Sequence, residues 1–202
     1  MTSISVSETV FIALAALSAL FSLLILLTGF LWPRVMLSRT RPFSTTVFFI
    51  SLCDFCVSIF NCLGFPQNNS NLCSFQGFGL LYFPPTSWLW TAMLVFQLRT
   101  LIIFKTIHLS MFWMHCICWG VPLLLSFLPL STNRYGADDA QDGNIPCDLN
   151  GNPTTKYIWL DSCSTGVAFF CFLLMAAWTW EIYTYCRRER SGGMNVCKFM
   201  YV

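Results

Sequence analysis

The sequence predicts an all-α protein: a polytopic membrane helix bundle with five transmembrane helices. Of its 202 residues, 56% are hydrophobic, 17% aromatic and only 10% charged, whereas a typical soluble domain is about 25% charged. Five apolar runs are long enough to cross a hydrocarbon core of about 30 Å, which requires roughly 20 helical residues. Basic residues gather at alternate ends of these runs. The bilayer is therefore the expected solvent, and the lipid is an expected partner.

The predicted helices cover residues 9–32, 43–63, 75–104, 110–131 and 157–185. The first run is longer than the apolar stretch of a secretory signal and follows Glu8 rather than a basic cluster, so we interpret it as a retained helix. The third contains Pro84 and Pro85, whose missing backbone N–H groups predict an interrupted, kinked helix with a cavity beside it. We expect residues 1–186 to form the membrane domain and residues 187–202 a short cytoplasmic tail.

Basic residues predict the orientation, because cytoplasmic segments retain them in excess. They lie at the end of the first, third and fifth runs or just after them: Arg34, Arg39, Arg41, Arg99, Lys105, Arg187, Arg188, Arg190 and Lys198. The other side carries only Arg134 and Lys156, together with four aspartates. We therefore expect an extracellular N-terminus and a cytoplasmic C-terminus. The net charge of +2 gives no indication of a nucleic-acid partner.

Of the eleven cysteines, Cys73 and Cys147 fall clearly on the predicted outer, oxidising side. A disulfide between them would tie the start of the third helix to the loop after the fourth and hold that loop over the bundle mouth. The alternative is two unpaired thiols. Asn68 begins an Asn-Asn-Ser glycosylation sequon on the same side, close to the membrane. Cys186 and Cys197 lie at the inner boundary among basic residues, a setting that suits palmitoylation.

The remaining cysteines and the histidines do not form a recognisable chemical site. Cys53 and Cys56 have C-x-x-C spacing but lie inside a helix, where core packing is expected. Cys116 and Cys118 lie on different faces of the fourth helix, so with His115 they cannot converge on one ion. The sequence also lacks a nucleophile, base and carboxylate in a recognisable arrangement. We expect no enzyme activity, no cofactor and no metal site.

Asp54 lies near the middle of the second helix, where an ionised carboxylate costs at least about 2.5–3.5 kcal/mol unless it faces the bundle interior. It would be a helix-packing switch, a cation site, or a protonated or hydrogen-bonded group that fixes its neighbours. Glu181, near the inner end of the fifth helix, would reach the headgroups or pair with Arg187. The predicted ligand pocket surrounds the prolines of the third helix and comprises Gln76, Phe83, Ser87, Trp88 and, at the pocket mouth, Asp161.

Several local strings occur in a specific order along the chain. The second helix contains Ser51-Leu52-Cys53-Asp54-Phe55, the third contains Cys73-Ser74-Phe75-Gln76-Gly77 and Ser87-Trp88-Leu89-Trp90-Thr91, and the fourth contains His115-Cys116-Ile117-Cys118-Trp119-Gly120-Val121-Pro122-Leu123. Together they resemble the G-protein-coupled receptors of the slime-mould cyclic-AMP receptor-like group, which is allied with the secretin-like receptors. One departure is Asp148, which follows Cys147 where the family usually has an aromatic residue.

The resemblance implies a seven-helix receptor fold, of which this chain would supply the first five helices. It also implies a multi-pass plasma-membrane protein that senses an extracellular ligand and passes a helix rearrangement to a heterotrimeric G protein. The expected G-protein face comprises Arg99, Lys105, Arg187 and Arg188. Because too few residues follow the fifth run for another crossing, we expect a truncated or fragmentary form. Such a form would act by associating with a full-length receptor sibling.

The alternative from another class is a small transporter or a structural membrane subunit that uses Asp54 as an ion or proton relay. Transporter folds typically contain internal repeats with broken helices in matching halves, and none is evident in this sequence. Asp54-dependent uptake without guanine-nucleotide exchange in a partner would favour this alternative.

Overall fold

The computed structural model of the protein describes residues 6–36, 42–63, 71–105, 110–131, 135–136, 148–149 and 164–191. The long helices are α1 (Val6–Leu31), α3 (Pro42–Cys62), α4 (Asn71–Phe104), α5 (Met111–Ser131) and α7 (Gly166–Ser191). The shorter elements are α2 (Pro33–Met36), β1 (Tyr135–Gly136) and β2 (Asp148–Leu149). All five long helices are long and apolar enough to cross a membrane. The predicted polytopic helix bundle is therefore confirmed.

Proline begins two of these helices. Pro33 opens α2 directly after α1 ends, and Pro42 opens α3. Proline suits the first helical position because the backbone N–H that it lacks has no partner there in any case. The same missing N–H prevents α1 from continuing regularly into α2.

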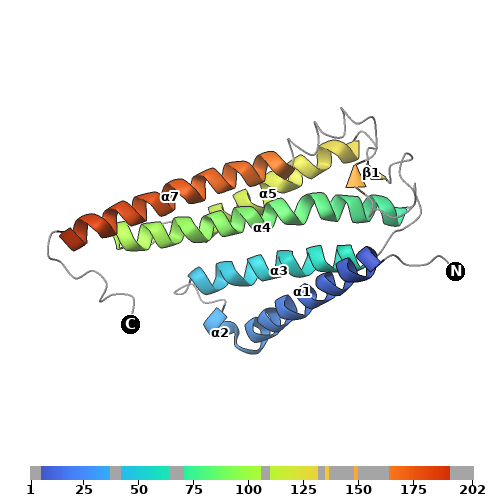
Figure 1. Cartoon of the computed structure of the whole chain (residues 1–202), viewed down its shortest axis with the longest axis horizontal. Coiled ribbons are helices and arrows are strands. Elements are labelled where there is room, and N and C mark those ends of the chain that lie inside the picture. Colours follow the sequence, from blue (N-terminus) through green and yellow to red (C-terminus); the bar gives the residue numbers. More distant parts are fainter. Residues whose placement is uncertain are drawn as a thin grey trace.

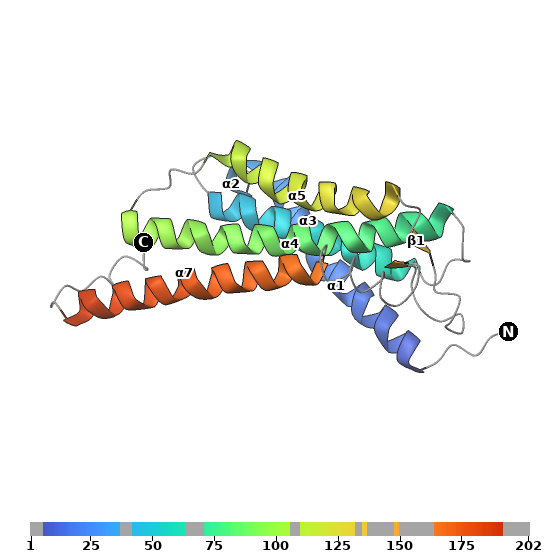
Figure 2. The same cartoon turned by 90° about the horizontal axis from the view of Figure 1, so that it is seen from above.

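Helix α4 lies at the centre of the bundle. It contacts α3, α5 and α7, whereas α1 packs against α3. Figure 1 shows α4 between α3 and α7, and the turned view in Figure 2 shows it between α5 and α7. Consecutive long helices run in alternating directions, so the start of α4 and the end of α3 lie at one end of the bundle, with β1. The predicted outer ends are thus together, as alternate crossings require.

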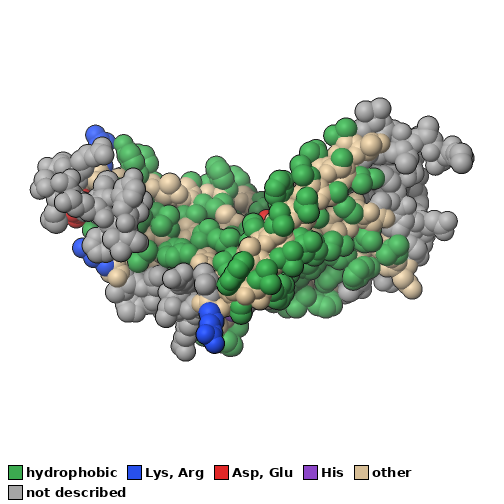
Figure 3. Space-filling view, turned by 90° about the horizontal axis from the view of Figure 1, so that it is seen from below, with side chains coloured by type: hydrophobic (Ala, Val, Ile, Leu, Met, Phe, Trp, Pro, Cys, Tyr) green, Lys and Arg blue, Asp and Glu red, His purple; other side chains and the backbone are tan. Residues whose placement is uncertain are grey.

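The exposed surface of the bundle is apolar, while polar side chains are buried. Leu124 is 71% exposed and Trp180 is 66% exposed, whereas Gln76 and Thr46 are fully buried. Figure 3 shows a broad hydrophobic surface over the middle of the molecule, with lysine and arginine side chains toward the end where α4 and α7 finish. Such a large apolar surface marks a lipid-facing protein. This is the end that the sequence predicts to face the cytoplasm.

Helix boundaries differ from the sequence prediction in two places. Helix α4 begins at Asn71 rather than at residue 75 and continues through Pro84 and Pro85 without the expected interruption. Pro85 is fully buried in the bundle, and membrane helices tolerate proline where neighbouring groups satisfy the freed backbone carbonyls. Helix α7 ends at Ser191 rather than at residue 185, and residues 157–163 of the predicted run lie outside the described residues.

A small antiparallel sheet, which the sequence did not predict, forms after α5. Tyr135 pairs with Leu149, and Gly136 pairs with Asp148. Both strands contact α4. The described parts of the loop after α5 therefore lie against the central helix.

Candidate functional site

Three polar contacts join α3 to α4, and we call them the outer, middle and inner contacts from the predicted extracellular side. The α4 residues are Gln76, Ser87 and Gln97, whose partners on α3 are Phe60, Asp54 and Thr46. At about 100° per residue, positions 76, 87 and 97 lie on neighbouring parts of one helix face. The partner numbers fall as the α4 numbers rise, because the two helices are antiparallel.

In the outer contact, the side-chain amide of Gln76 donates a 2.9 Å hydrogen bond to the backbone carbonyl of Phe60. Gln76 is fully buried. One turn away, Gly79 faces the Phe60 ring so closely that an added Cβ atom would lie 2.4 Å from it. The lack of a side chain at Gly79 therefore allows the two helices to approach beside the Gln76 hydrogen bond.

In the middle contact, the hydroxyl of Ser87 donates a 2.8 Å hydrogen bond to Oδ1 of Asp54. Asp54 is half-buried, and the hydroxyl of Ser58 donates to its backbone carbonyl at 2.8 Å. Asp54 thus faces the neighbouring helix through one carboxylate oxygen. This geometry supports the predicted inward orientation and the proposed role in helix packing.

In the inner contact, Nε2 of Gln97 donates to Oγ1 of Thr46 at 3.0 Å and to Sδ of Met114 at 3.2 Å. Gln97 therefore links α4 to both α3 and α5. Gln97 and Thr46 are both buried. This pair was not predicted from the sequence. A glutamine within an apolar run is the signal that could have indicated it, because a buried amide in a membrane needs partners.

Four aromatic side chains pack between the middle and inner contacts. The ring of Trp90 stacks on Phe49 with centroids 4.9 Å apart, and His115 meets both rings edge to face. The indole N–H of Trp119 donates to Nδ1 of His115 at 3.1 Å. The His115 ring thus packs between helices, a role that the sequence did not predict. Edge-to-face rings add about 0.5–1.5 kcal/mol beyond their buried area.

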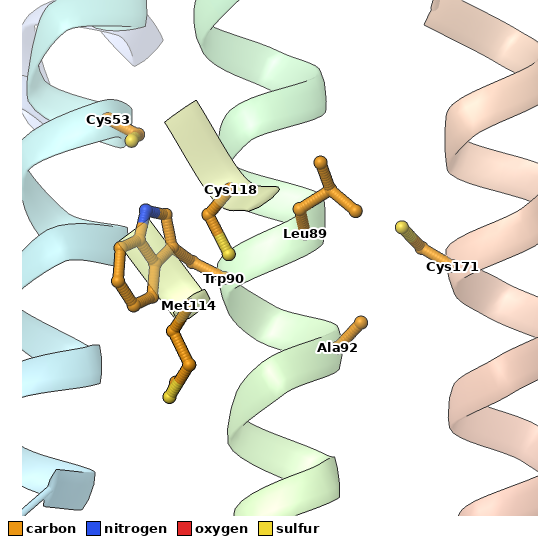
Figure 4. Close-up of a cluster of buried hydrophobic side chains, with 7 residues drawn as sticks. All are labelled: Cys53, Leu89, Trp90, Ala92, Met114, Cys118 and Cys171. Carbon is orange, nitrogen blue, oxygen red and sulfur yellow. The ribbon is translucent and has the colours of Figure 1, made fainter. Parts of the chain in front are cut away.

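The hydrophobic core surrounds α4, as Figure 4 shows. Its buried members come from α3, α4, α5 and α7: Cys53, Leu89, Trp90, Ala92, Met114, Cys118 and Cys171. Cys53 is fully buried, as core packing requires. Cys118 is buried, whereas Cys116 is exposed, so the two thiols do lie on different faces. Within the described residues, no group of three or more histidine, cysteine or acidic side chains is placed to hold a metal ion.

An ion pair joins the inner parts of α4 and α7. Nε of Arg99 donates to Oε2 of Glu181, and the Arg99 guanidinium lies 5.6 Å from the centroid of the Phe104 ring. Glu181 was expected to reach the headgroups or pair with Arg187, but it pairs with a residue of the central helix. The partner could not be read from the sequence, since 82 residues separate the pair.

The predicted pocket residues have partners in the bundle. Gln76 and Ser87 bond to α3, while Phe83 lies with its ring centroid 5.7 Å from Phe60 and Trp88 packs against the core. Asp161 lies outside the described residues. Gln76, Phe83 and Ser87 thus contact α3, and the role of the predicted set as a ligand pocket stays a prediction.

The predicted outer modifications remain predictions as well. Cys73 is fully buried at the start of α4 and is not among the free cysteines, but Cys147 lies outside the described residues, as does Asn68. Strand β2 begins at Asp148, directly after Cys147, and contacts α4. The strand that follows Cys147 therefore lies against the helix that carries Cys73.

The predicted G-protein face lies at the opposite end of the bundle. Arg99 is in the last third of α4, Lys105 follows the end of α4 with a positive φ of 55°, and Arg187 and Arg188 lie in the last turns of α7. Arg187 and Arg188 are exposed. These four residues gather where α4 and α7 end, and a role in binding G protein is a proposal.

The fold and these contacts define a class: a multi-pass membrane protein whose helices pack around a central third transmembrane helix. Comparison with known proteins narrows the class. Residues 1–137 match the family model described as slime mold cyclic AMP receptor, and the chain belongs to this family of receptors. This confirms the family that the sequence motifs predicted.

One relative is Cyclic AMP receptor-like protein A of Dictyostelium discoideum, which is 34% identical over 105 residues. The alignment covers 50% of this chain and 28% of the relative. The family match includes α1 to α5 and β1, while β2 and α7 lie beyond it. The chain is thus a receptor-like membrane protein that corresponds to just over a quarter of this relative.

Proposed function

We propose that the chain is the ligand-sensing helix bundle of a plasma-membrane receptor that signals to a heterotrimeric G protein. The observation that carries the proposal is the family match over residues 1–137. Receptors of this type are not enzymes, so the absence of a recognisable catalytic arrangement in the sequence agrees with the proposal.

The position of α4 supports a mechanism by population shift. This helix extends from Cys73, near the predicted outer surface, to Arg99, near the inner surface, and contacts three other long helices. Sliding α4 along α3 would separate hydrogen-bonded partners at the outer, middle and inner contacts. Packed interfaces of this kind prefer a few discrete arrangements. A ligand that binds one arrangement better shifts the bundle toward it.

Cyclic AMP is the first ligand to test, because both the family and its Dictyostelium relative carry its name. Its phosphate requires donors or positive charge. In the described part of the chain, the arginines and lysine lie in or near segments predicted to face the cytoplasm. Arg134 and Lys156 are the outer candidates in the sequence, and both lie outside the described residues.

Surface labelling and guanine-nucleotide exchange would test the proposal in cells that lack their own cyclic-AMP receptors. In such cells, we expect the wild-type chain to change the cyclic-AMP-dependent exchange of a co-expressed full-length receptor of the family. Cys73→Ala should abolish surface expression or the response if the predicted disulfide holds the loop. Cys116→Ala, which removes an exposed thiol of α5, is the matched control and should respond normally. A normal Cys73→Ala response would contradict the disulfide.

Association with a full-length receptor is tested separately, by expressing the chain alone and together with a full-length member of the family. We expect the chain to associate with the full-length receptor and to change its exchange response. A response by the chain alone would show that it couples directly. No effect in either setting, with normal surface expression, would refute the receptor proposal.

A further inference from the structure

A groove of about 300 Å³ lies between α1 and α3. It is lined by Phe11, Leu14, Ala15, Ser18, Asp54, Val57, Ser58 and Asn61. Figure 3 shows a hollow in the apolar surface with an acidic side chain at its base. The receptor proposal does not use this groove.

The α3 wall of the groove is mainly polar. Asp54, Ser58 and Asn61 are spaced i, i+4 and i+7, so they form one stripe on the helix. The stripe rises from the middle of α3 to within one residue of its end at Cys62, a rise of about 10 Å at 1.5 Å per residue. Across the groove, α1 contributes three apolar side chains and Ser18.

Asp54 can serve both α4 and this groove because a carboxylate has two oxygens. Oδ1 accepts the hydrogen bond from Ser87, and the carboxyl group also borders the groove. A carboxylate at this depth is costly unless a positive charge or a hydrogen-bond donor faces it. Ser87 donates to one oxygen, but no groove residue carries a positive charge, so a bound cation would further stabilise the carboxylate.

The volume and the lining of the groove favour an organic cation over a metal ion. A hard metal ion such as Ca²⁺ requires six to eight oxygen ligands, whereas half of this lining is Phe11, Leu14, Ala15 and Val57. The groove volume of about 300 Å³ is also far more than a bare ion fills. A primary ammonium group offers three donors and no acceptor, and an attached hydrocarbon chain would cover the apolar wall.

We propose that the groove binds a primary alkylammonium, with its ammonium group at Asp54 and its hydrocarbon chain between α1 and α3. The same chemistry occurs in water-soluble aliphatic amines and in membrane amphiphiles with an amine headgroup. Phe11 and Leu14, which line the groove, are 43% and 62% exposed, so the groove is accessible from the apolar surface of the bundle.

Thermal unfolding of the full chain in lipid nanodiscs tests the proposal. Hexylamine should raise Tm saturably by roughly 3 °C or more, as a ligand specific for the folded state does. Hexanol, which has the same chain without the charge, should not. Sphinganine incorporated in the nanodisc tests a lipid amine. A Tm increase with sphinganine but not hexylamine indicates that the bound amine comes from the bilayer, and the reverse indicates a water-soluble amine.

Two variants locate the site. Asp54→Asn removes the charge but keeps an oxygen that accepts from Ser87, and it should weaken amine binding at least tenfold. Ala15→Phe should fill the groove and abolish the shift, whereas Ala16→Phe, at a neighbouring exposed position of α1, should retain it. If the Asp54→Asn variant fails to fold, the comparison of Ala15→Phe with Ala16→Phe tests the proposal.

Three results would overturn the proposal. An equal shift with hexanol would show that the groove takes up hydrocarbon without regard to charge. If sodium chloride raised Tm by the same amount and abolished the effect of the amine, the site would belong to an inorganic cation. Unchanged binding in folded Asp54→Asn or in Ala15→Phe would place the amine elsewhere. None of these results depends on signalling, so they leave the receptor proposal untouched.

Discussion

Replacing Gly79 with alanine probes the closest approach of α3 to α4. The added Cβ would lie 2.4–2.5 Å from three atoms of the Phe60 ring, whereas carbon atoms are best separated by about 3.5–4.0 Å. The ring would have to retreat by about 1 Å. It is only 8% exposed and lies near Phe75 and Phe83, at centroid distances of 5.1 and 5.7 Å. The neighbouring rings therefore resist the movement.

The expected cost follows from two opposing effects. Overpacking costs about 1–3 kcal/mol, and replacing a helical glycine with alanine returns about 0.5–1 kcal/mol. We expect a net loss of about 1–2 kcal/mol in the free energy of unfolding. In a chain of this size, that loss lowers Tm by roughly 2–8 °C. Thermal unfolding of the purified protein in nanodiscs measures it.

Gly120→Ala is the matched control for this experiment. An added Cβ at Gly120 would meet no atom within 4 Å, so this variant should be as stable as the wild type or slightly more stable. Phe60→Leu combined with Gly79→Ala should recover part of the loss, because the smaller side chain makes room. Equal stability of the Gly79→Ala and Gly120→Ala variants, or strictly additive effects in the double variant, would refute the proposed clash.

Other contacts give further predictions for the same assay. Ser87→Ala removes the middle contact and should cost about 1 kcal/mol, more than Thr91→Ala, whose hydroxyl bonds only within α4; an equal loss would contradict this. Gln97→Leu should also cost about 1 kcal/mol, and an unchanged Tm would show that the inner contact is energetically neutral. A double-mutant cycle on Arg99 and Glu181 should give a coupling below about 1 kcal/mol. That coupling energy should decrease when the salt concentration is raised from 0.1 to 1 M, because the Debye length falls from about 10 to 3 Å. A coupling energy that does not change with salt would contradict a solvent-accessible pair.

The sequence alone predicted the five crossings because hydrophobic length is a local property. Residues 43–63 and 110–131 correspond closely to α3 and α5. Local signals failed where the end of an element depends on its neighbours. Pro84 and Pro85 predicted an interruption, yet both lie within α4, and Pro85 is fully buried among the packed helices. The strand pair after α5 also escaped notice, because two-residue strands leave no periodic pattern.

The candidate site was predicted in part. Asp54 stood out because a carboxylate is costly inside a membrane, and its inward orientation followed from that cost. Its partner Ser87 was assigned to a ligand pocket instead, because the register of α3 against α4 cannot be read from either helix alone. The contacts of Gln97, Thr46 and His115 were not predicted for the same reason.

The sequence by itself thus determined the solvent, the crossings and the family, since composition, run length and motifs are written along the chain. Only the tertiary structure decided which polar groups meet. Oδ1 of Asp54 accepts from Ser87, 33 residues away, and Arg99 pairs with Glu181 across 82 residues. Such partners depend on the rotation and register of packed helices, which the side chains of several helices fix together.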